Sequence, residues 1–188
     1  MMKNLIKTIF TTCLITLTLH SCEAQKVVVN REVDTKTDGK MLLGPQTEDQ
    51  FTKEPYSNWY NDEFANYQLD EKAIDELRKE KLNTYQLIVF IGTWCEDSHR
   101  EFPRLMKILE TLKYPTDKLT IIAVNRKKES PSGEEGLHNI QKVPTIIVKK
   151  YGKEFGRIIE FPKTGFIEKD LLEIVKKNDT SVSDLFKK

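Results

Sequence analysis

The chain has 188 residues, 38% of them hydrophobic and 31% charged, which is enough for one domain with additional segments at its ends. Lys and Arg number 30 and Asp and Glu number 29, so the formal net charge is +1 at pH 7. Binding to nucleic acid phosphates requires a basic surplus, and this balance therefore argues against a nucleic acid partner.

Residues 1–22 have the pattern of a secretion signal. Lys3 and Lys7 give a basic start, and an apolar stretch follows over residues 9–19. That stretch is too short to span a bilayer comfortably, and it ends in small or polar residues before a charged sequence. We therefore expect this segment to direct export and to lie outside the folded part.

The signal ends in Leu-His-Ser-Cys at residues 19–22, which resembles the bacterial lipoprotein signal. In that signal the cysteine is acylated and becomes the new N-terminus, so the resemblance implies a lipid anchor on Cys22. It also implies a place in the bacterial cell envelope, facing the periplasm or the exterior. His20 departs from the pattern, which usually has a smaller residue there. An ordinary cleavage after about Ala24, which would release the protein unanchored, stays open.

The three cysteines have different fates under this interpretation. Cys13 is discarded with the signal, Cys22 is blocked by lipid, and Cys95 is left as a single free thiol. No internal disulfide can then form in the mature protein. A single thiol on a protein exported to an oxidising compartment is unusual enough to need a functional reason.

Two segments precede the main domain. Residues 23–40 are polar and are expected to form a tether between the membrane and the domain. Residues 41–67 are rich in aromatic side chains, and Tyr60, Phe64 and Tyr67 have the i, i+4, i+7 spacing of one helical face. Two interpretations are open for them, an extension packed on the domain or an aromatic surface that binds a partner.

Residues 68–178 alternate between helix and strand patterns, and residues 179–188 are expected to form a polar tail. The expected elements are, in chain order, a helix at 69–82 capped by Asp70, a strand at 85–91, a helix at 98–113, a strand at 119–124, a polar loop at 126–142, strands at 145–148 and 155–161, and a helix at 167–176. This order predicts an α/β domain with a mixed sheet and helices on both faces.

Cys95 stands where a predicted buried strand passes into a helix, in the sequence Gly-Thr-Trp-Cys-Glu-Asp-Ser at residues 92–98. Free backbone N–H groups and the positive end of the helix dipole stabilise a thiolate at such a position. Because the thiolate is the nucleophile in disulfide exchange, the position indicates redox chemistry.

This part of the chain resembles the thioredoxin superfamily. Trp94, Cys95 and Ser98 match that family's Trp-Cys-x-x-Cys motif with serine in place of the second cysteine, a monothiol version. Pro103 stands eight residues after Cys95, where thioredoxins carry the proline that kinks this helix. Val-Pro-Thr at residues 143–145, followed by an apolar strand and Gly-Lys-Glu, resembles the family's cis-proline loop and final hairpin. The resemblance covers roughly residues 68–178 and implies a thioredoxin-like fold.

The resemblance also implies a site. In this family the cis-proline loop faces the reactive cysteine and offers backbone groups that pair with an incoming peptide. A cis X–Pro bond is far less costly than other cis peptide bonds, which suits a proline to this place. Trp94, Val143, Pro144 and Thr145 would accordingly line a substrate groove beside Cys95.

Two departures from the family restrict the chemistry. Ser98 cannot resolve a mixed disulfide, although its hydroxyl is expected to donate a hydrogen bond to the Cys95 thiolate. Val89 stands six positions before Cys95, where thioredoxins usually bury an acidic residue that serves the second cysteine. Self-resolving dithiol reduction is therefore excluded for the isolated chain.

What remains is one-thiol chemistry. We expect thiol–disulfide exchange in the cell envelope, of reductase or isomerase type, with disulfide- or thiol-containing envelope proteins or small thiols as partners and a monomeric, lipid-anchored chain. The alternative is a redox-inactive thioredoxin-fold binding module that uses the same groove, so whether the chain is an enzyme stays open. Peroxide chemistry is a weaker third possibility, because the sequence around Cys95 does not match the family's peroxide-reducing branch.

Histidines and metals add little to this interpretation. His99, four residues after Cys95, could tune the thiol or be a solvated surface residue, and His138 could approach the site as a base. One cysteine and scattered histidines give no ligand set, so neither a metal nor another cofactor is expected.

Overall fold

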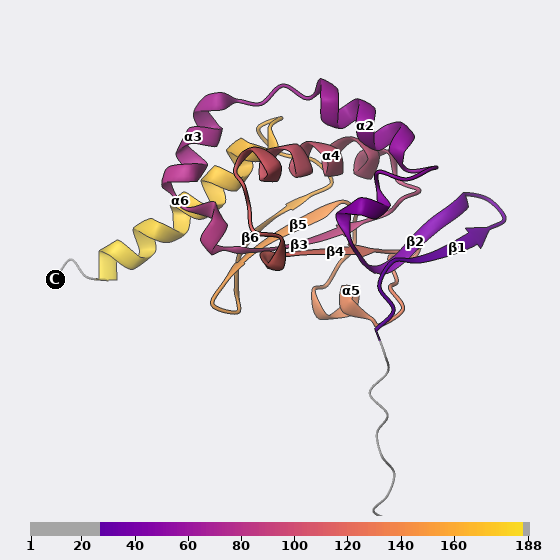
Figure 1. Ribbon diagram of the computed structural model, residues 1–188. Helices are drawn as coiled ribbons and strands as arrows, with labels where there is room; N and C mark the ends of the chain where they lie inside the picture. Colours follow the sequence, from indigo (N-terminus) through magenta and orange to yellow (C-terminus); the bar gives the residue numbers. More distant parts are fainter. Residues whose placement is uncertain (1–26, 186–188) are drawn as a thin grey trace, which may run out of the picture.

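The computed structural model describes residues 27–185, with side chains as far as residue 177 (Figure 1). The expected signal at residues 1–22, its Cys22 and the last three residues of the polar tail lie outside the described residues. Within residues 27–185, no helix combines the length and the apolar character needed to cross a membrane.

A six-stranded mixed sheet forms the centre of the fold. Its strands are β1 (Arg31–Thr35), β2 (Gly39–Gln46), β3 (Gln86–Ile91), β4 (Leu119–Ala123), β5 (Thr145–Lys150) and β6 (Lys153–Ile159), in the spatial order β1-β2-β4-β3-β5-β6. Strands β3 and β4 are parallel, and every other neighbouring pair is antiparallel. The parallel pair requires a crossover connection, which α4 (Glu96–Thr111) supplies.

The helices are distributed unevenly over the two faces of this sheet. Four of them, α2 (Ser57–Asn66), α3 (Glu71–Lys79), α4 and α6 (Ile167–Leu185), cover one face, as Figure 1 shows. The other face, called the thin side below, carries the four-residue α5 (Glu134–Leu137) and the loops beside it. The sequence predicts the mixed sheet and helices on both faces correctly, but not this asymmetry.

Strand β3 shows how the sequence creates two unequal cores. Successive side chains of a strand point to opposite faces, and Leu87, Val89 and Ile91 face the helices while Phe90 faces the thin side. The helix side holds a large cluster of buried aromatic and aliphatic residues. The thin side has a smaller cluster of six buried residues, namely Phe90, Ile122, Val124, Ile140, Val143 and Ile147. Val89, fully buried, leaves no acidic group at its position in the strand.

The segment expected to be a tether differs from that expectation over residues 31–40. These residues form β1, a turn and the start of β2, and β2 pairs with β4 to join the main sheet. The turn contains Asp38 followed by Gly39 at φ +64°, a sequence that favours a tight hairpin. Asn30 fixes the entry of the chain, since its side chain exchanges hydrogen bonds of 2.8 Å with Thr47 and its N–H donates to the Pro45 carbonyl at 2.9 Å.

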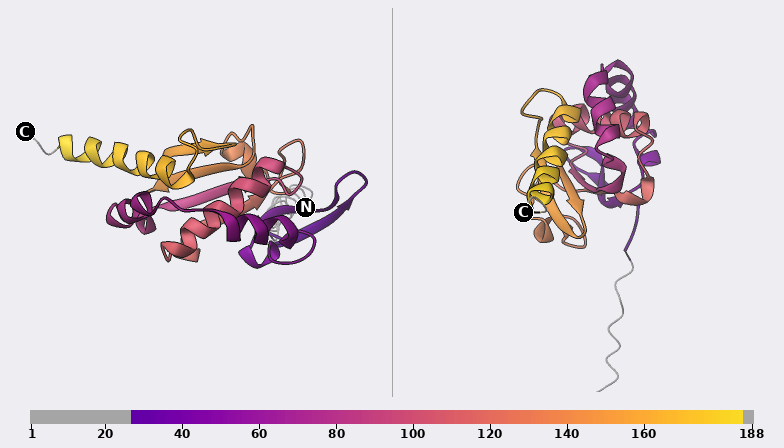
Figure 2. Two further views of the ribbon diagram at one scale, coloured as in Figure 1. Left: turned by 90° about the horizontal axis from the view of Figure 1, so that it is seen from above. Right: turned by 90° about the vertical axis from the view of Figure 1, so that its left-hand side faces the viewer.

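The aromatic segment at 41–67 contributes to the main core. Helix α2 packs against α4, and Phe51, Tyr56 and Tyr60 are buried there. The ring of Phe51 lies 4.6 Å from that of Phe102 on α4, measured between centroids. At the other end, α6 continues to Leu185, through most of the segment expected to be a polar tail, and Figure 2 shows this helix running out beyond the sheet.

Candidate active site at the start of helix α4

Cys95 is the N-cap residue of α4, with an extended backbone at φ −106° and ψ 120°. Its side chain is half-buried at the margin of the thin-side core. The thiol donates to the carbonyl oxygen of Val143, with 3.4 Å between sulfur and oxygen. The first N–H groups of a helix have no intrahelical acceptor, so the sulfur lies at a helix end that favours negative charge.

The loop that carries Val143 contains a cis peptide bond between Val143 and Pro144, as the family resemblance implies. The Pro144 carbonyl accepts from the N–H of Glu160 at 2.7 Å, and Lys142 forms an ion pair with the Glu160 carboxylate at 2.6 Å. These contacts attach the loop to the end of β6. Thr145 is 2% exposed and its hydroxyl donates to the Lys142 carbonyl at 2.7 Å, so its side chain braces the loop from behind.

Trp94 lies next to the thiol and packs against the same cluster of buried residues. Its ring packs on the thin-side core, and its Nε1–H donates to the Val124 carbonyl at 2.9 Å. Gly92 makes this placement possible, because a Cβ atom at that position would lie 2.6 Å from Cε2 of the Trp94 ring. The structure thus brings Trp94, Cys95 and the Val143–Pro144 bond together around one sulfur.

Ser98 occupies a different place from the expected one. It is 1% exposed, and its Oγ accepts from the Gly92 N–H at 3.2 Å. No hydrogen bond joins Ser98 to Cys95 in residues 27–185. The serine therefore closes the turn that holds the cysteine and leaves the sulfur to the Val143 carbonyl. Thr93 has a related role, since its hydroxyl accepts from the Leu42 N–H at 3.2 Å and ties this turn to β2.

His99 is held in place by neighbours and is not a freely solvated residue. Its Nε2 lies 2.8 Å from the Thr93 carbonyl oxygen, and its ring stacks on Trp59 of α2 at 4.4 Å between centroids. His138 lies elsewhere, 5.6 Å from the Phe90 ring, and has no hydrogen bond to Cys95. Burial, followed by the charges of Lys149 and Arg157, lowers the pKa of His138.

Arg126, in the loop after β4, is a site residue that sequence reasoning missed. Its guanidinium pairs with the Asp38 carboxylate through Nε at 2.9 Å and also through Nη2, and it lies over the Trp94 ring at 5.1 Å from the centroid. The hydrogen bonds that Arg126 donates to the Asp38 carboxylate raise the pKa of Arg126. Asp38 and Arg126 are 88 residues apart, and no local pattern links them.

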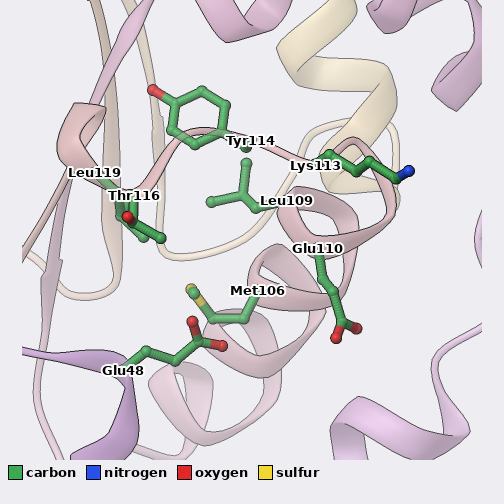
Figure 3. A pocket seen from close by; sticks show the side chains of 8 residues that line it. All are labelled: Glu48, Met106, Leu109, Glu110, Lys113, Tyr114, Thr116 and Leu119. Atoms are coloured by element: carbon green, nitrogen blue, oxygen red, sulfur yellow. The ribbon is translucent and has the colours of Figure 1, made fainter.

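Two hollows lie along α4. One, of about 400 Å³, adjoins the site between α2 and α4 and is lined by Trp59, Asp62, Glu63, Asn66, Glu96, His99 and Arg100. The other, of about 270 Å³, lies near the C-terminal end of α4, where Figure 3 shows Met106 and Leu109 pointing into it between Glu48 and Tyr114. Within the described residues, no group of three or more His, Cys, Asp or Glu side chains could hold a metal ion.

The sequence of this chain matches no protein-family model and no curated protein. Solved structures of similar fold include a protein of unknown function from Pseudomonas aeruginosa, 17% identical, with a TM-score of 0.49 over 65% of this chain and 82% of that one. Mitochondrial thioredoxin 3 from Saccharomyces cerevisiae is 25% identical, with a TM-score of 0.31 over 46% of this chain and 76% of that one. A yeast mitochondrial 1-Cys peroxiredoxin is 23% identical, with a TM-score of 0.35 over 58% and 90% of the respective chains.

The order of elements defines the class of fold. A parallel pair joined by α4, an antiparallel pair β5–β6, and a cis-proline just before β5 that faces the start of α4 make this a thioredoxin-like fold. The protein is thus a chain of thioredoxin-like fold, and Cys95, the one cysteine among its described residues, stands where α4 begins.

Proposed function

We propose that this protein carries out thiol–disulfide exchange through the single cysteine Cys95. The observation that carries the proposal is the position of its sulfur, half-buried at the start of α4 and 3.4 Å from the carbonyl that precedes the cis-proline. Trp94 and the Val143–Pro144 loop lie next to the sulfur, which is only partly buried. Partly exposed thiols at helix N-termini are the ones that react in disulfide exchange.

The reaction has two balanced steps. The Cys95 thiolate attacks one sulfur of a substrate disulfide, so that a new S–S bond forms, the substrate S–S bond breaks, and the other sulfur leaves as a thiolate that takes a proton from water. A second thiolate, from the substrate or from a small thiol, then attacks the mixed disulfide and releases Cys95. The chain needs this external thiol because Ser98 has no sulfur and is turned toward Gly92.

A direct test is to mix the purified protein with a peptide disulfide and follow the mass of the chain. We expect one adduct of one peptide half on Cys95, which a small thiol removes, and none on the Cys95→Ser variant. The Ser98→Ala variant serves as the matched control and should form the adduct at a similar rate, since its hydroxyl does not contact the sulfur. If the wild-type chain forms no adduct, the chain is a redox-inactive binding module of the same fold.

We further propose that the chain is attached to the bacterial cell envelope by lipid on Cys22, with envelope proteins or small thiols as its substrates. Support comes from the sequence of residues 1–22 and from the short distance, eight residues, between Cys22 and the fixed entry point at Asn30. The Cys22→Ser variant should leave the membrane fraction while Cys95→Ser stays in it. Recovery of Cys22→Ser in that fraction would contradict the anchor.

A further inference from the structure

The charges on the two sides of Cys95 differ in sign. On the side of Trp94, Arg126 lies 5.1 Å and the Nζ of Lys128 lies 5.6 Å from the centroid of the indole ring. Both cations belong to the loop after β4 and stand over the residue that precedes the thiol. On the side of α2, the hollow beside His99 is lined by the carboxylates of Asp62, Glu63 and Glu96 and by one cation, Arg100. Glu63 is paired with Arg104 at 2.6 Å.

Several contacts keep the two cations in this place. Arg126 is gripped by Asp38 from the tip of the β1–β2 hairpin, yet its side chain is still 60% exposed. Lys128 has a left-handed backbone at φ +67°, and its Nζ donates to the Arg126 carbonyl at 3.2 Å. The Trp94 ring beneath them is itself fixed by its bond to the Val124 carbonyl. The two cations therefore lie at defined positions over the residue next to Cys95, and Arg126 is presented to solvent.

The carboxylates of the first turn of α4 do not cancel this positive side. Asp97 is paired with Arg100 at 2.8 Å, and Glu96 lines the hollow on the α2 side. Arg126 is paired with Asp38 in the same way, and Lys128, which forms no ion pair within the described residues, leaves the charge over Trp94 positive. Trp94 immediately precedes Cys95 in the chain, so the cations over its ring lie near the start of α4. A negative group on a substrate would meet Arg126 and Lys128 when its sulfur reached Cys95.

We propose that Arg126 and Lys128 make Cys95 selective for disulfides that carry carboxylates close to the sulfur. This inference rests on the proposed exchange function and adds its substrate class. The carboxylate lies over the Trp94 side of the groove, where two cations over the aromatic ring attract it and orient the S–S bond toward the thiolate. Such a group can belong to an acidic polypeptide segment or to a small carboxylate-bearing disulfide.

The experiment measures second-order rates of adduct formation on the full chain in detergent, with Cys13→Ser and Cys22→Ser so that Cys95 is the one thiol left. Two peptide disulfides are compared, identical except that Glu residues flank the cysteine in one and Lys residues in the other. Each rate is divided by that of 2-mercaptoethanol with the same peptide, which removes the intrinsic effect of the flanking charges. We expect the normalised Glu-to-Lys ratio to be about tenfold at low salt and to fall toward one at 0.5 M salt.

Substitutions at Arg126 and Lys128 test whether these two residues cause the preference for the Glu peptide. Arg126→Gln and Lys128→Gln should each lower the ratio about threefold, and the double variant should abolish it. Lys127→Gln is the matched control, because it removes a cation of the same loop that does not lie over Trp94, and its ratio should stay within twofold of the wild type. A wild-type ratio of one or less, or a ratio that the double variant leaves unchanged, would overturn the selectivity while leaving exchange intact.

Failure of the proposed function has a different signature. If neither peptide gives an adduct, exchange itself is absent, and the selectivity is overturned with it. A third probe, 3,3′-dithiodipropionate, distinguishes the two sources of the carboxylate. A normalised rate equal to that of the Glu peptide supports a small acidic disulfide, and a lower rate supports an acidic polypeptide.

Discussion

The two faces of the sheet differ in how much apolar surface they bury and in which of them carries Cys95. The helix-covered face buries a continuous cluster of large side chains, including Phe51, Tyr60 and Phe102, and supplies most of the apolar burial. The thin side has a buried cluster of only six apolar residues, yet Trp94, Cys95 and Val143 belong to it or pack against it. The reactive loop is thus supported from one side by a large core and exposed on the other. Substitutions in the large core should therefore change the free energy of unfolding without changing the reactivity of Cys95.

The largest effect is expected on the helix-covered face. Phe51→Ala removes a fully buried ring that contacts Phe102 and Tyr60, and it should lower the free energy of unfolding by about 3–5 kcal/mol. Urea unfolding measures this loss. Below the unfolding transition the alkylation rate of Cys95 should match the wild type. A loss below 1 kcal/mol, or a changed alkylation rate of the folded variant, would break the division between the faces.

Gly92→Ala tests the junction of the two regions. The added Cβ would lie 2.6 Å from the Trp94 ring, so the ring must shift from its place on the thin face. We expect a loss of about 1–3 kcal/mol, together with a change in tryptophan fluorescence and in the rate at which Cys95 is alkylated. Unchanged fluorescence and rate would show that Trp94 does not hold the reactive loop.

His138 on the thin face should give a smaller, pH-dependent effect. Its pKa is lowered in the folded state by burial, so the unfolded chain binds more protons as the pH falls below the ordinary value of about 6.5. Its contribution to stability is therefore present above that pH and is lost progressively as the pH falls toward the folded pKa. Urea unfolding at pH 7.5 and 5.5 should show a smaller difference for His138→Gln than for the wild type, and an identical difference would contradict this assignment.

The smallest effect is expected from Cys95→Ala. The side chain is half-buried at the margin of the thin-side core, and its contact to Val143 is a weak sulfur hydrogen bond. The melting temperature should stay within a few degrees of the wild type while all exchange is lost. A larger drop in melting temperature would show that the thiol is a structural part of the thin face.

The elements that sequence reasoning predicts well are those defined by local apolar patterns. Strand β3 and helix α4 follow from the apolar run before Gly92 and from the helical spacing after Ser98, and the cis-proline at Pro144 follows from the family resemblance. The resemblance also predicts that Trp94 lies near the loop that contains Val143 and Pro144.

The features that the sequence does not predict depend on contacts between residues that are far apart in the chain. Strand β1 was missed because its polar residues lack an apolar alternation, although Asp38-Gly39 was a readable turn signal. The pairings of Asp38 with Arg126 and of Trp59 with His99 join residues 88 and 40 positions apart, and only the fold brings them together. The turn of Ser98 toward Gly92 likewise depends on the geometry of the first turn of α4.

The hydrogen bonds that Asn30 forms with Thr47 and Pro45 determine how the fold responds to a pulling force. A pulling force on the chain before Asn30 meets the four hydrogen bonds of Asn30 first, three with the Thr47 side chain and backbone and one with the Pro45 carbonyl. Once they break, the edge strand β1 peels from β2 one bond at a time, because its first residue is loaded first. That peeling would carry Asp38 away from Arg126 while the rest of the sheet stays paired. Tension on the N-terminal segment is therefore transmitted to the cation beside the thiol before it reaches the core.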